Sequence, residues 1–337
     1  NPPFAFNPKA TNVYFGDPHT SWVTGQTATT PVFASGLTNL ANDYPAPAVA
    51  QYSFGVQHQL NPEMIWVVQY VGNLAWHQNI ERQINNFPLN TPMSIRANAG
   101  DPNNHTGTNP GGTNLANSEI YRTYQGYDTI NQEENTTNGT YNGFQTGLRF
   151  QSYHGLSGEV DYTYSHEIDI TSYDLGPVSN PWNLKYDKGS GALDKRHILG
   201  INYIYLLPIF AHGSGFAHSI LGGWEIAGTA NEASGAIPAN QGPGFGSNYD
   251  PIGLDGGYTN RPNQVGKVHY TKKVGEWFDP AAFANPVPAW AGGANQGFGN
   301  ARKDAVLGPG RINFDTSLYK SFAITEGSHI ELRFESY

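Results

Sequence analysis

The sequence predicts an all-β fold: an antiparallel, membrane-spanning β-barrel segment with long loops at one rim. Three observations support this prediction. Polar and apolar residues alternate in roughly eight segments, and alternation is the two-residue period of a β-strand. Only 13% of the 337 residues are charged, against about 25% in an average soluble domain. The connections between the segments are alternately short and long, as expected for the two rims of a barrel.

The alternation is clearest at residues 158–169, GEVDYTYSHEID. Glu159 and Asp161 lie on one predicted face, and Tyr162 and Tyr164 lie on the other. The apolar face would be core in a soluble sandwich, whereas in an outer-membrane barrel it contacts lipid and the polar face lines the lumen. We predict the barrel, because aromatic residues at strand ends favour a membrane interface and a lumen tolerates charges.

The strands are predicted in pairs joined by short turns. They cover residues 49–60, 64–73, 141–152, 157–169, 195–208, 222–235, 311–322 and 328–337. The short turns lie near residues 61, 155, 209–221 and 326, and the long polar connections are 75–140, 170–194 and 236–310. We expect the long connections on one side of the sheet and the turns on the other, a rhythm that a sandwich does not require.

The alternation assigns candidate residues to the two faces. The predicted lumen-facing residues are Gln145, Arg149, Glu159, Asp161, Asp315, Glu331 and Arg333. The predicted lipid-facing aromatic residues are Trp66, Tyr70, Tyr162, Tyr203, Trp224 and Phe314.

Composition argues against several classes of protein. A formal net charge of −9 argues against a nucleic-acid partner, which requires a basic surface. No apolar run approaches the length of about 18 residues that a transmembrane helix needs. With no cysteine, neither a disulfide framework nor a thiolate zinc site is expected. The N-terminal stretch lacks the pattern of a signal peptide, so we expect the chain to be a piece of a longer protein.

Candidate catalytic groups have simpler interpretations. Glu133 and Glu134 are adjacent in a Thr/Asn-rich stretch, whereas acid–base catalysis needs two carboxylates at a defined separation across a pocket. His166 and Glu167 are neighbours on a predicted strand, so they point to opposite faces and cannot both bind one ion. We therefore expect no catalytic residue, no metal site on the strands and no enzymatic activity.

Two loop stretches are rich in potential oxygen ligands, DPNNHTGTNPGGTN at 101–114 and YDPIGLDGGYTN at 249–260. Neither has the acidic spacing of an EF-hand, and the same residue types are common in turns. We expect no cofactor, and loop-bound Ca²⁺ is the alternative.

Five stretches, in order along the chain, carry a family resemblance. They are AQYSFGVQHQLNPEMIWVVQYVGN, LDKRHILGINYIYLLP, LGGWEIAGTANEASGAIP, WFDPAAFANP and FGNARKDAVLGPGRINFDTSLYKSFAITEGSHIELRFESY. The chain resembles the C-terminal barrel portion of Oar-like TonB-dependent outer-membrane receptors. The resemblance implies a bacterial outer-membrane location, a 22-stranded barrel with an N-terminal plug, and substrate uptake driven through TonB.

The resemblance also implies partners beyond this chain, which lacks a plug, a TonB box and the final strands of such a receptor. We expect the first and last predicted strands, near Val49 and Phe334, to pair with other strands of the receptor. The expected partners are outer-membrane lipid, the remaining strands and plug, TonB, and an unknown extracellular substrate bound by the loops. The alternative function is a secreted, lectin-like carbohydrate-binding module.

Overall fold

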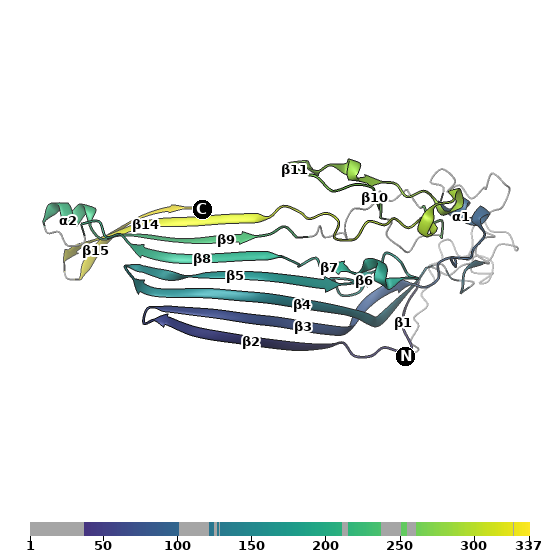
Figure 1. The fold of residues 1–337 in the computed structure, drawn as a ribbon, viewed down its shortest axis with the longest axis horizontal. Coiled ribbons are helices and arrows are strands. Elements are labelled where there is room, and N and C mark those ends of the chain that lie inside the picture. The colour runs from purple at the N-terminus through teal and green to yellow at the C-terminus, as the bar shows by residue number, and fades with distance from the viewer. Residues whose placement is uncertain are drawn as a thin grey trace, which may run out of the picture.

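The computed structural model describes residues 37–100, 121–124, 127, 129–210, 215–236, 251–254, 261–325 and 327–337. Long antiparallel strands form a single broad sheet that runs along the longest axis of the molecule (Figure 1). The prediction of an all-β, antiparallel fold is confirmed.

The main path of the sheet contains eight strands, each hydrogen-bonded to the next. In spatial order they are β15 (Ser328–Ser336), β14 (Arg311–Thr325), β9 (Trp224–Ala233), β8 (His197–Leu206), β5 (Leu156–Asp169), β4 (Ile130–Tyr153), β3 (Met64–Gln83) and β2 (Ala48–Asn61). Among the described residues, β2 and β15 are the two edges and do not pair with each other. The described part of the sheet is therefore an open wall.

Shorter elements lie at one end of this wall. Three short strands join the sheet: β1 (Leu37–Leu40) and β6 (Gly176–Pro177) pair parallel with β4 and β3, and β7 (Gly189–Ser190) pairs antiparallel with β5. Two separate pairs are β10 (Asn263–Gln264) with β13 (Phe283–Ala284), and β11 (Tyr270–Lys273) with β12 (Glu276–Phe278).

The helices are short. They are α1 (Met93–Gly100), α2 (Phe216–Leu221) and the 3₁₀ turns η2 (Leu184–Asp187), η3 (Pro280–Ala282), η4 (Ala289–Ala291) and η5 (Ala294–Gly297). Within the described segments, no helix has both the length and the apolar character needed to cross a bilayer.

Turns and long connections lie at opposite ends, as predicted. Figure 1 shows α2 and the β14–β15 turn at one end, and α1, β6, β7 and β10 at the other. We call these the turn end and the loop end.

The predicted bounds of two strands need correction. β3 continues to Gln83 instead of ending at residue 73, and β4 begins at Ile130 instead of 141. The pairing of these strands is irregular between Trp76 and Asn79, and His77 has a φ of 56°. Such an irregularity moves the following side chains to the other face. The alternation is therefore interrupted there, and the sequence gives no clear signal for the rest of the hairpin.

The buried apolar core lies in the loop end, away from the long strands. Its members are Phe87, Ile95, Ile252, Leu254 and Phe298, with Leu89, Tyr121, Trp182 and Tyr186 packed against them. We call this group the loop cap. It joins residues of the β3–β4, β5–β8 and β9–β14 connections, so described parts of all three pack together.

Candidate functional site

The sheet register separates the predicted residues into two groups. Residues directly opposite on antiparallel strands have side chains on the same face, so each pairing carries the assignment to the next strand. One face, here called the polar face, carries Gln145, Arg149, Glu159, Asp161, Asp315, Glu331 and Arg333. The other, the apolar face, carries Trp66, Tyr70, Tyr162, Tyr203, Trp224 and Phe314. Contact with the lumen or with lipid remains a prediction for both groups.

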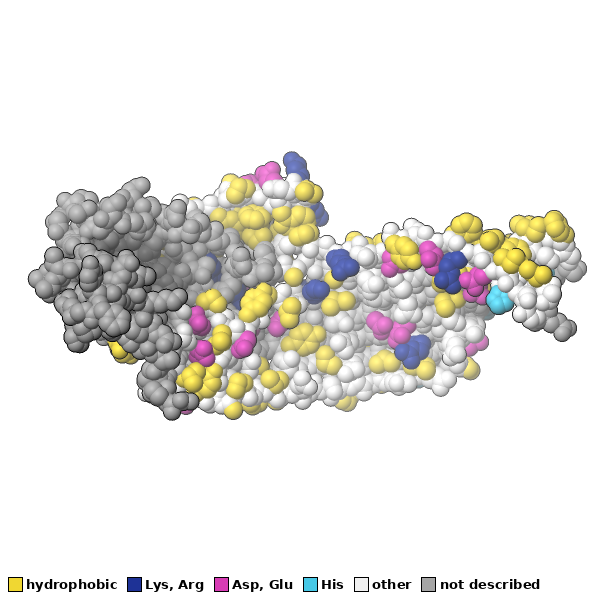
Figure 2. Space-filling model, turned by 180° about the vertical axis from the view of Figure 1, so that it is seen from behind, with side chains coloured by type: hydrophobic (Ala, Val, Ile, Leu, Met, Phe, Trp, Pro, Cys, Tyr) yellow, Lys and Arg dark blue, Asp and Glu magenta, His cyan; other side chains and the backbone are white. Residues whose placement is uncertain are grey.

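The polar face has a shallow cavity of about 500 Å³ over strands β2 to β5. Its lining includes Gln57, Gln69 and Gln145 together with the pair Arg149 and Glu159. Arg149 Nη2 donates to both carboxylate oxygens of Glu159, at 3.0 and 3.2 Å. On the broad face seen in Figure 2, charged side chains form small groups within a largely white surface. The lining of the cavity thus combines glutamine amides and threonine hydroxyls with the Arg149–Glu159 ion pair.

A second cavity of about 390 Å³ lies nearer the loop end. Asn73, Tyr141 and Glu167 line it, and each is four residues from Gln69, Gln145 or Thr163 in the first cavity. Four residues of strand span roughly 13 Å. The two cavities therefore follow one another along the strands.

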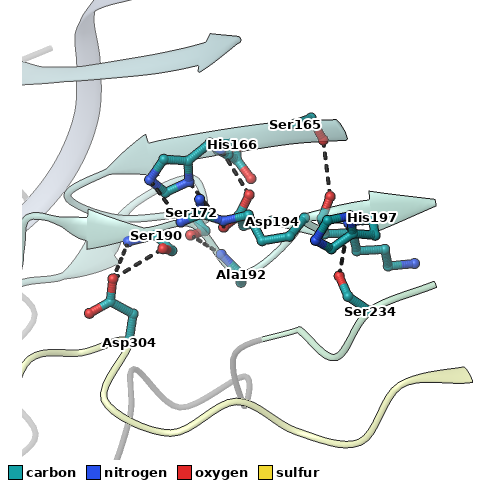
Figure 3. Close-up of polar contacts among 12 residues, drawn as sticks. Ser165, His166, Ser172, Ser190, Ala192, Asp194, His197, Ser234 and Asp304 are labelled. Carbon is teal, nitrogen blue, oxygen red and sulfur yellow. Dashed lines mark hydrogen bonds and ion pairs between the residues drawn. The ribbon is translucent and has the colours of Figure 1, made fainter. Parts of the chain in front are cut away.

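A ring of hydrogen-bonded side chains joins the end of β5 to the start of β8 (Figure 3). The buried Asp194 Oδ2 lies 3.1 Å from both His166 Nδ1 and Arg196 Nε, and Asp194 Oδ1 accepts from Glu167 N at 2.9 Å. Arg196 Nη2 lies 3.0 Å from His166 Nε2. Because arginine only donates, His166 Nε2 is the acceptor in this contact. His166 is thus held between the two members of the Arg196–Asp194 ion pair, and Glu167 points to the opposite face, as predicted.

A buried lysine occupies the neighbouring position at the loop end. Lys303 Nζ donates to the Asp169 carboxylate and, at 3.1 Å each, to the carbonyl oxygens of Asp169 and Ile170. Ser172 Oγ donates to the other carboxylate oxygen at 2.5 Å. Lys303 is only 4% exposed. The sequence offered no signal for this pair, because its members are 134 residues apart.

Glu167 lies beside this pair, two residues before Asp169 at the end of β5. Its carboxyl group is near the charged groups of Asp169, Asp194 and Lys303.

Asp304 anchors the β9–β14 connection to β7 (Figure 3). Its Oδ2 accepts from Ser190 N and Ser190 Oγ, both at 3.0 Å, and Arg302 donates to both carboxylate oxygens. Burial alone would raise the pKa of Asp304, but the hydrogen bonds from Arg302 and Ser190 outweigh it and lower the pKa to about 2.

Buried arginines hold the loop cap together. Arg96, 0% exposed, donates from Nε to Ile252 O at 3.0 Å and from Nη1 to Gln296 Oε1 at 2.6 Å. Arg261 donates to Asp187 Oδ1 at 3.0 Å, and both side chains are 1% exposed. Each arginine therefore links two different connections of the cap.

The remaining sequence candidates have structural roles or lie outside the description. Glu134 is 3% exposed and paired with Arg82 at 2.7 Å, so it supports the β3–β4 hairpin. Residues 101–114 lie outside the described residues, as does all of 249–260 except 251–254. Across the described part of the chain, no group of three or more His, Asp or Glu side chains could hold a metal ion. The expectation of no cofactor, and its alternative of loop-bound Ca²⁺, both remain untested.

Comparison with known proteins gives a family and similarity to solved structures. The family model described as "Outer membrane beta barrel domain" matches residues 1–337. A solved structure, the outer membrane transporter YddB from Escherichia coli, is similar at 10% sequence identity and a TM-score of 0.40. That match covers 87% of this chain and 29% of the transporter chain, so this chain spans less than a third of that protein. No curated protein matches.

The family match includes every residue and agrees with the sheet described above. Of the two predicted classes, it supports the membrane barrel over the secreted carbohydrate-binding module. An outer-membrane location also means contact with membrane lipid. The chain belongs to the outer membrane beta barrel domain family and is a protein of the bacterial outer membrane.

Proposed function

We propose that this chain forms part of the barrel wall of an Oar-like TonB-dependent receptor, which binds a substrate through its extracellular loops and takes it up through the barrel. In this proposal the apolar face contacts lipid and the polar face lines the lumen. The loop end is extracellular, and the turn end is periplasmic. The chain itself has no catalytic role.

The observation that carries the proposal is the pairing of aromatic donors on the apolar face. Trp66 Nε1 donates to Thr146 Oγ1 at 2.8 Å, and the hydroxyls of Tyr70 and Tyr52 donate to Asn142 Oδ1 at 2.6 and 3.1 Å. An unpaired donor in hydrocarbon costs several kcal/mol. Because the N–H and O–H donors of these aromatic residues are paired on the face itself, the face can contact lipid without that cost.

The charges of the polar face support the same orientation. Arg149 is 66% exposed, and an arginine on the lipid face of a barrel costs about 2–4 kcal/mol at the bilayer midplane. The same residue in a water-filled lumen carries no such cost. The successive cavities on this face would give a polar solute a sequence of amide, hydroxyl and carboxylate contacts.

The edges of the sheet indicate further strands. Within the described residues, β2 pairs only with β3 and β15 only with β14. Unmatched backbone groups are costly in a bilayer, so only closed barrels cross it. We propose that both edges pair with other strands of a 22-stranded receptor barrel, whose lumen holds a plug that contacts TonB.

Surface labelling tests the orientation. Val274 is fully exposed at the tip of the β11–β12 hairpin, and Pro62 lies in the β2–β3 turn at the other end. The chain has no cysteine, so Val274→Cys and Pro62→Cys each introduce one thiol. A membrane-impermeant maleimide should label Val274→Cys on intact cells, and Pro62→Cys only after the outer membrane is permeabilised. The reverse pattern would show that the orientation is wrong.

Solute depletion tests the transport role. Cells with and without the gene are grown in a defined medium, and the medium is profiled by mass spectrometry. We expect at least one solute that only gene-containing cells remove, and removal should stop when the proton-motive force is collapsed. Removal that persists without that force would indicate a passive pore, and identical profiles would contradict uptake.

A further inference from the structure

The buried Lys303 and Asp169 at the loop end have no part in the proposed transport function. Both lie out of water: Lys303 is 4% exposed and Asp169 is 8% exposed. The amine of Lys303 is in direct contact with the carboxylate of Asp169. An amine held against a carboxyl group is the arrangement from which an amide forms.

A third group, Glu167, lies within reach of the same carboxylate. The position that a Cβ would occupy at Gly191 is 2.6 Å from Glu167 Oε2 and 2.9 Å from Asp169 Oδ2. Both carboxyl groups therefore approach one point, and only a glycine leaves them room to do so. Glu167 and Asp169 are two residues apart on β5, so they share a face.

Burial favours a neutral product over the ion pair. Removing two charges from water is costly, and their attraction offsets this only when the geometry is excellent. An amide has no charge to desolvate, and its N–H and C=O groups can use the hydrogen-bond partners already present, namely Ser172 and the carbonyl oxygens of Asp169 and Ile170. Condensation would thus remove the main cost of the buried pair.

We propose that Lys303 and Asp169 form an intramolecular isopeptide bond, with Glu167 as the proton carrier. Nζ of Lys303 attacks Cγ of Asp169, and the new C–N bond replaces one C–O bond. The departing oxygen of Asp169 leaves as water with two of the three ammonium protons, which Glu167 transfers. The third proton remains on the amide nitrogen. No oxidant or other reactant is needed.

The bond would fasten the β9–β14 connection to the end of β5. Its two ends are 134 residues apart, and the chain has no cysteine with which to make a disulfide. A covalent link that closes a long loop restricts the unfolded chain and so stabilises the folded one.

Intact-mass spectrometry of the protein, purified from outer membranes in detergent and then denatured, tests the proposal. We expect a mass lower by one water than the sequence requires. Proteolysis should yield a branched peptide that joins Asp169 to Lys303. Asp169→Asn should lose one ammonia instead, because an amide nitrogen becomes the leaving group. A measured mass equal to the one that the sequence requires, with Lys303 found in an unbranched peptide, would overturn the proposal.

Two variants separate the bond from the ion pair. Lys303→Arg keeps the positive charge but cannot form the amide. It should fold, as judged by heat-dependent gel mobility, and its mass should equal the one that its sequence requires. Glu167→Gln should fold and lower the linked fraction by at least tenfold. A linked fraction equal to that of the unaltered protein would show that Glu167 does not carry the protons. A Lys303→Arg protein that still lacks one water would place the linkage elsewhere and also overturn the proposal.

Discussion

The sheet wall and the loop cap place their apolar side chains in opposite ways. In the wall, Phe54 is 75% exposed and Phe314 is 67% exposed, whereas in the cap Ile252 and Leu254 are completely buried. The cap has the buried core that water requires. Among the described residues, the wall has no such apolar cluster, and in the proposed arrangement its apolar face contacts lipid. If that arrangement is right, each region should respond differently to the same kind of substitution.

The largest expected effect comes from removing a cap aromatic. The Phe298 ring packs against those of Trp182 and Tyr186 at centroid distances of 6.2 and 5.5 Å. Phe298→Ala should destabilise the cap by about 3–5 kcal/mol, since it leaves a cavity in a packed core. Amide hydrogen exchange in detergent should rise around Tyr186 while the central part of β4 stays protected.

The matched control is Phe314→Ala on the apolar face of the wall. Detergent or lipid can fill the space that this substitution leaves, so the cap amides should keep their protection. If Phe298→Ala loosens β4 as much as the cap, the two regions form one cooperative unit, and the comparison between them fails.

An added positive charge should destabilise the protein more on the apolar face of the wall than on the polar face. Leu148→Arg on the apolar face should destabilise the folded protein in lipid by about 2–4 kcal/mol, as arginine does on the lipid face of membrane barrels. Gln145→Arg, on the polar face of the same strand, should change the free energy of unfolding by no more than about 0.5 kcal/mol. Urea unfolding in vesicles measures both. Equal costs would mean that the two faces meet the same environment.

Acid should increase hydrogen exchange where Asp304 contacts β7 before it affects the long strands of the wall. The folded-state pKa of Asp304, about 2, lies below the value of about 3.9 in an unfolded chain. Its stabilising effect is therefore complete above about pH 4 and is lost as the pH falls toward 2. Hydrogen exchange near Ser190 should rise over that range, and Asp304→Asn should reduce the pH dependence. If the variant kept the same pH dependence, Asp304 would not be the group that causes the loss of protection in acid.

The smallest effect is expected for the exposed ion pair of the polar face. Arg149→Gln should cost about 0.2–1 kcal/mol, because water screens a pair of this kind. The cost should shrink as the salt concentration rises. If this change in the free energy of unfolding did not depend on salt, Arg149 would be shielded from water. That result would contradict a water-filled lumen on the polar face.

The sequence predicted the wall well because a strand's alternation is a local pattern. Glu159 and Tyr162 were assigned to opposite faces from a few neighbouring residues, and the register agrees. The pattern was lost where β3 becomes irregular near His77, so both β3 and β4 were predicted too short.

The cap could not be predicted in the same way. Phe87, Ile252 and Phe298 come from separate connections rich in Gly, Asn and Pro, with no period to join them. Their contacts, like that of Lys303 with Asp169, depend on the fold bringing distant segments together. From the sequence, Glu167 was considered only as a metal ligand. Its neighbours along the strand suggest that role, whereas nothing in the sequence indicates that Lys303 lies close to it.

Collision accessibility of spin labels along β4 shows which face of the wall contacts lipid. Single cysteines are placed at Phe144, Gln145, Thr146, Gly147, Leu148 and Arg149 in the otherwise cysteine-free chain, and the labelled proteins are reconstituted in vesicles. We expect accessibility to oxygen, which concentrates in lipid, to peak at the even-numbered positions. Accessibility to a water-soluble nickel chelate should peak at the odd-numbered positions. The opposite phase, or no alternation, would contradict an apolar face in lipid and a polar face along the lumen.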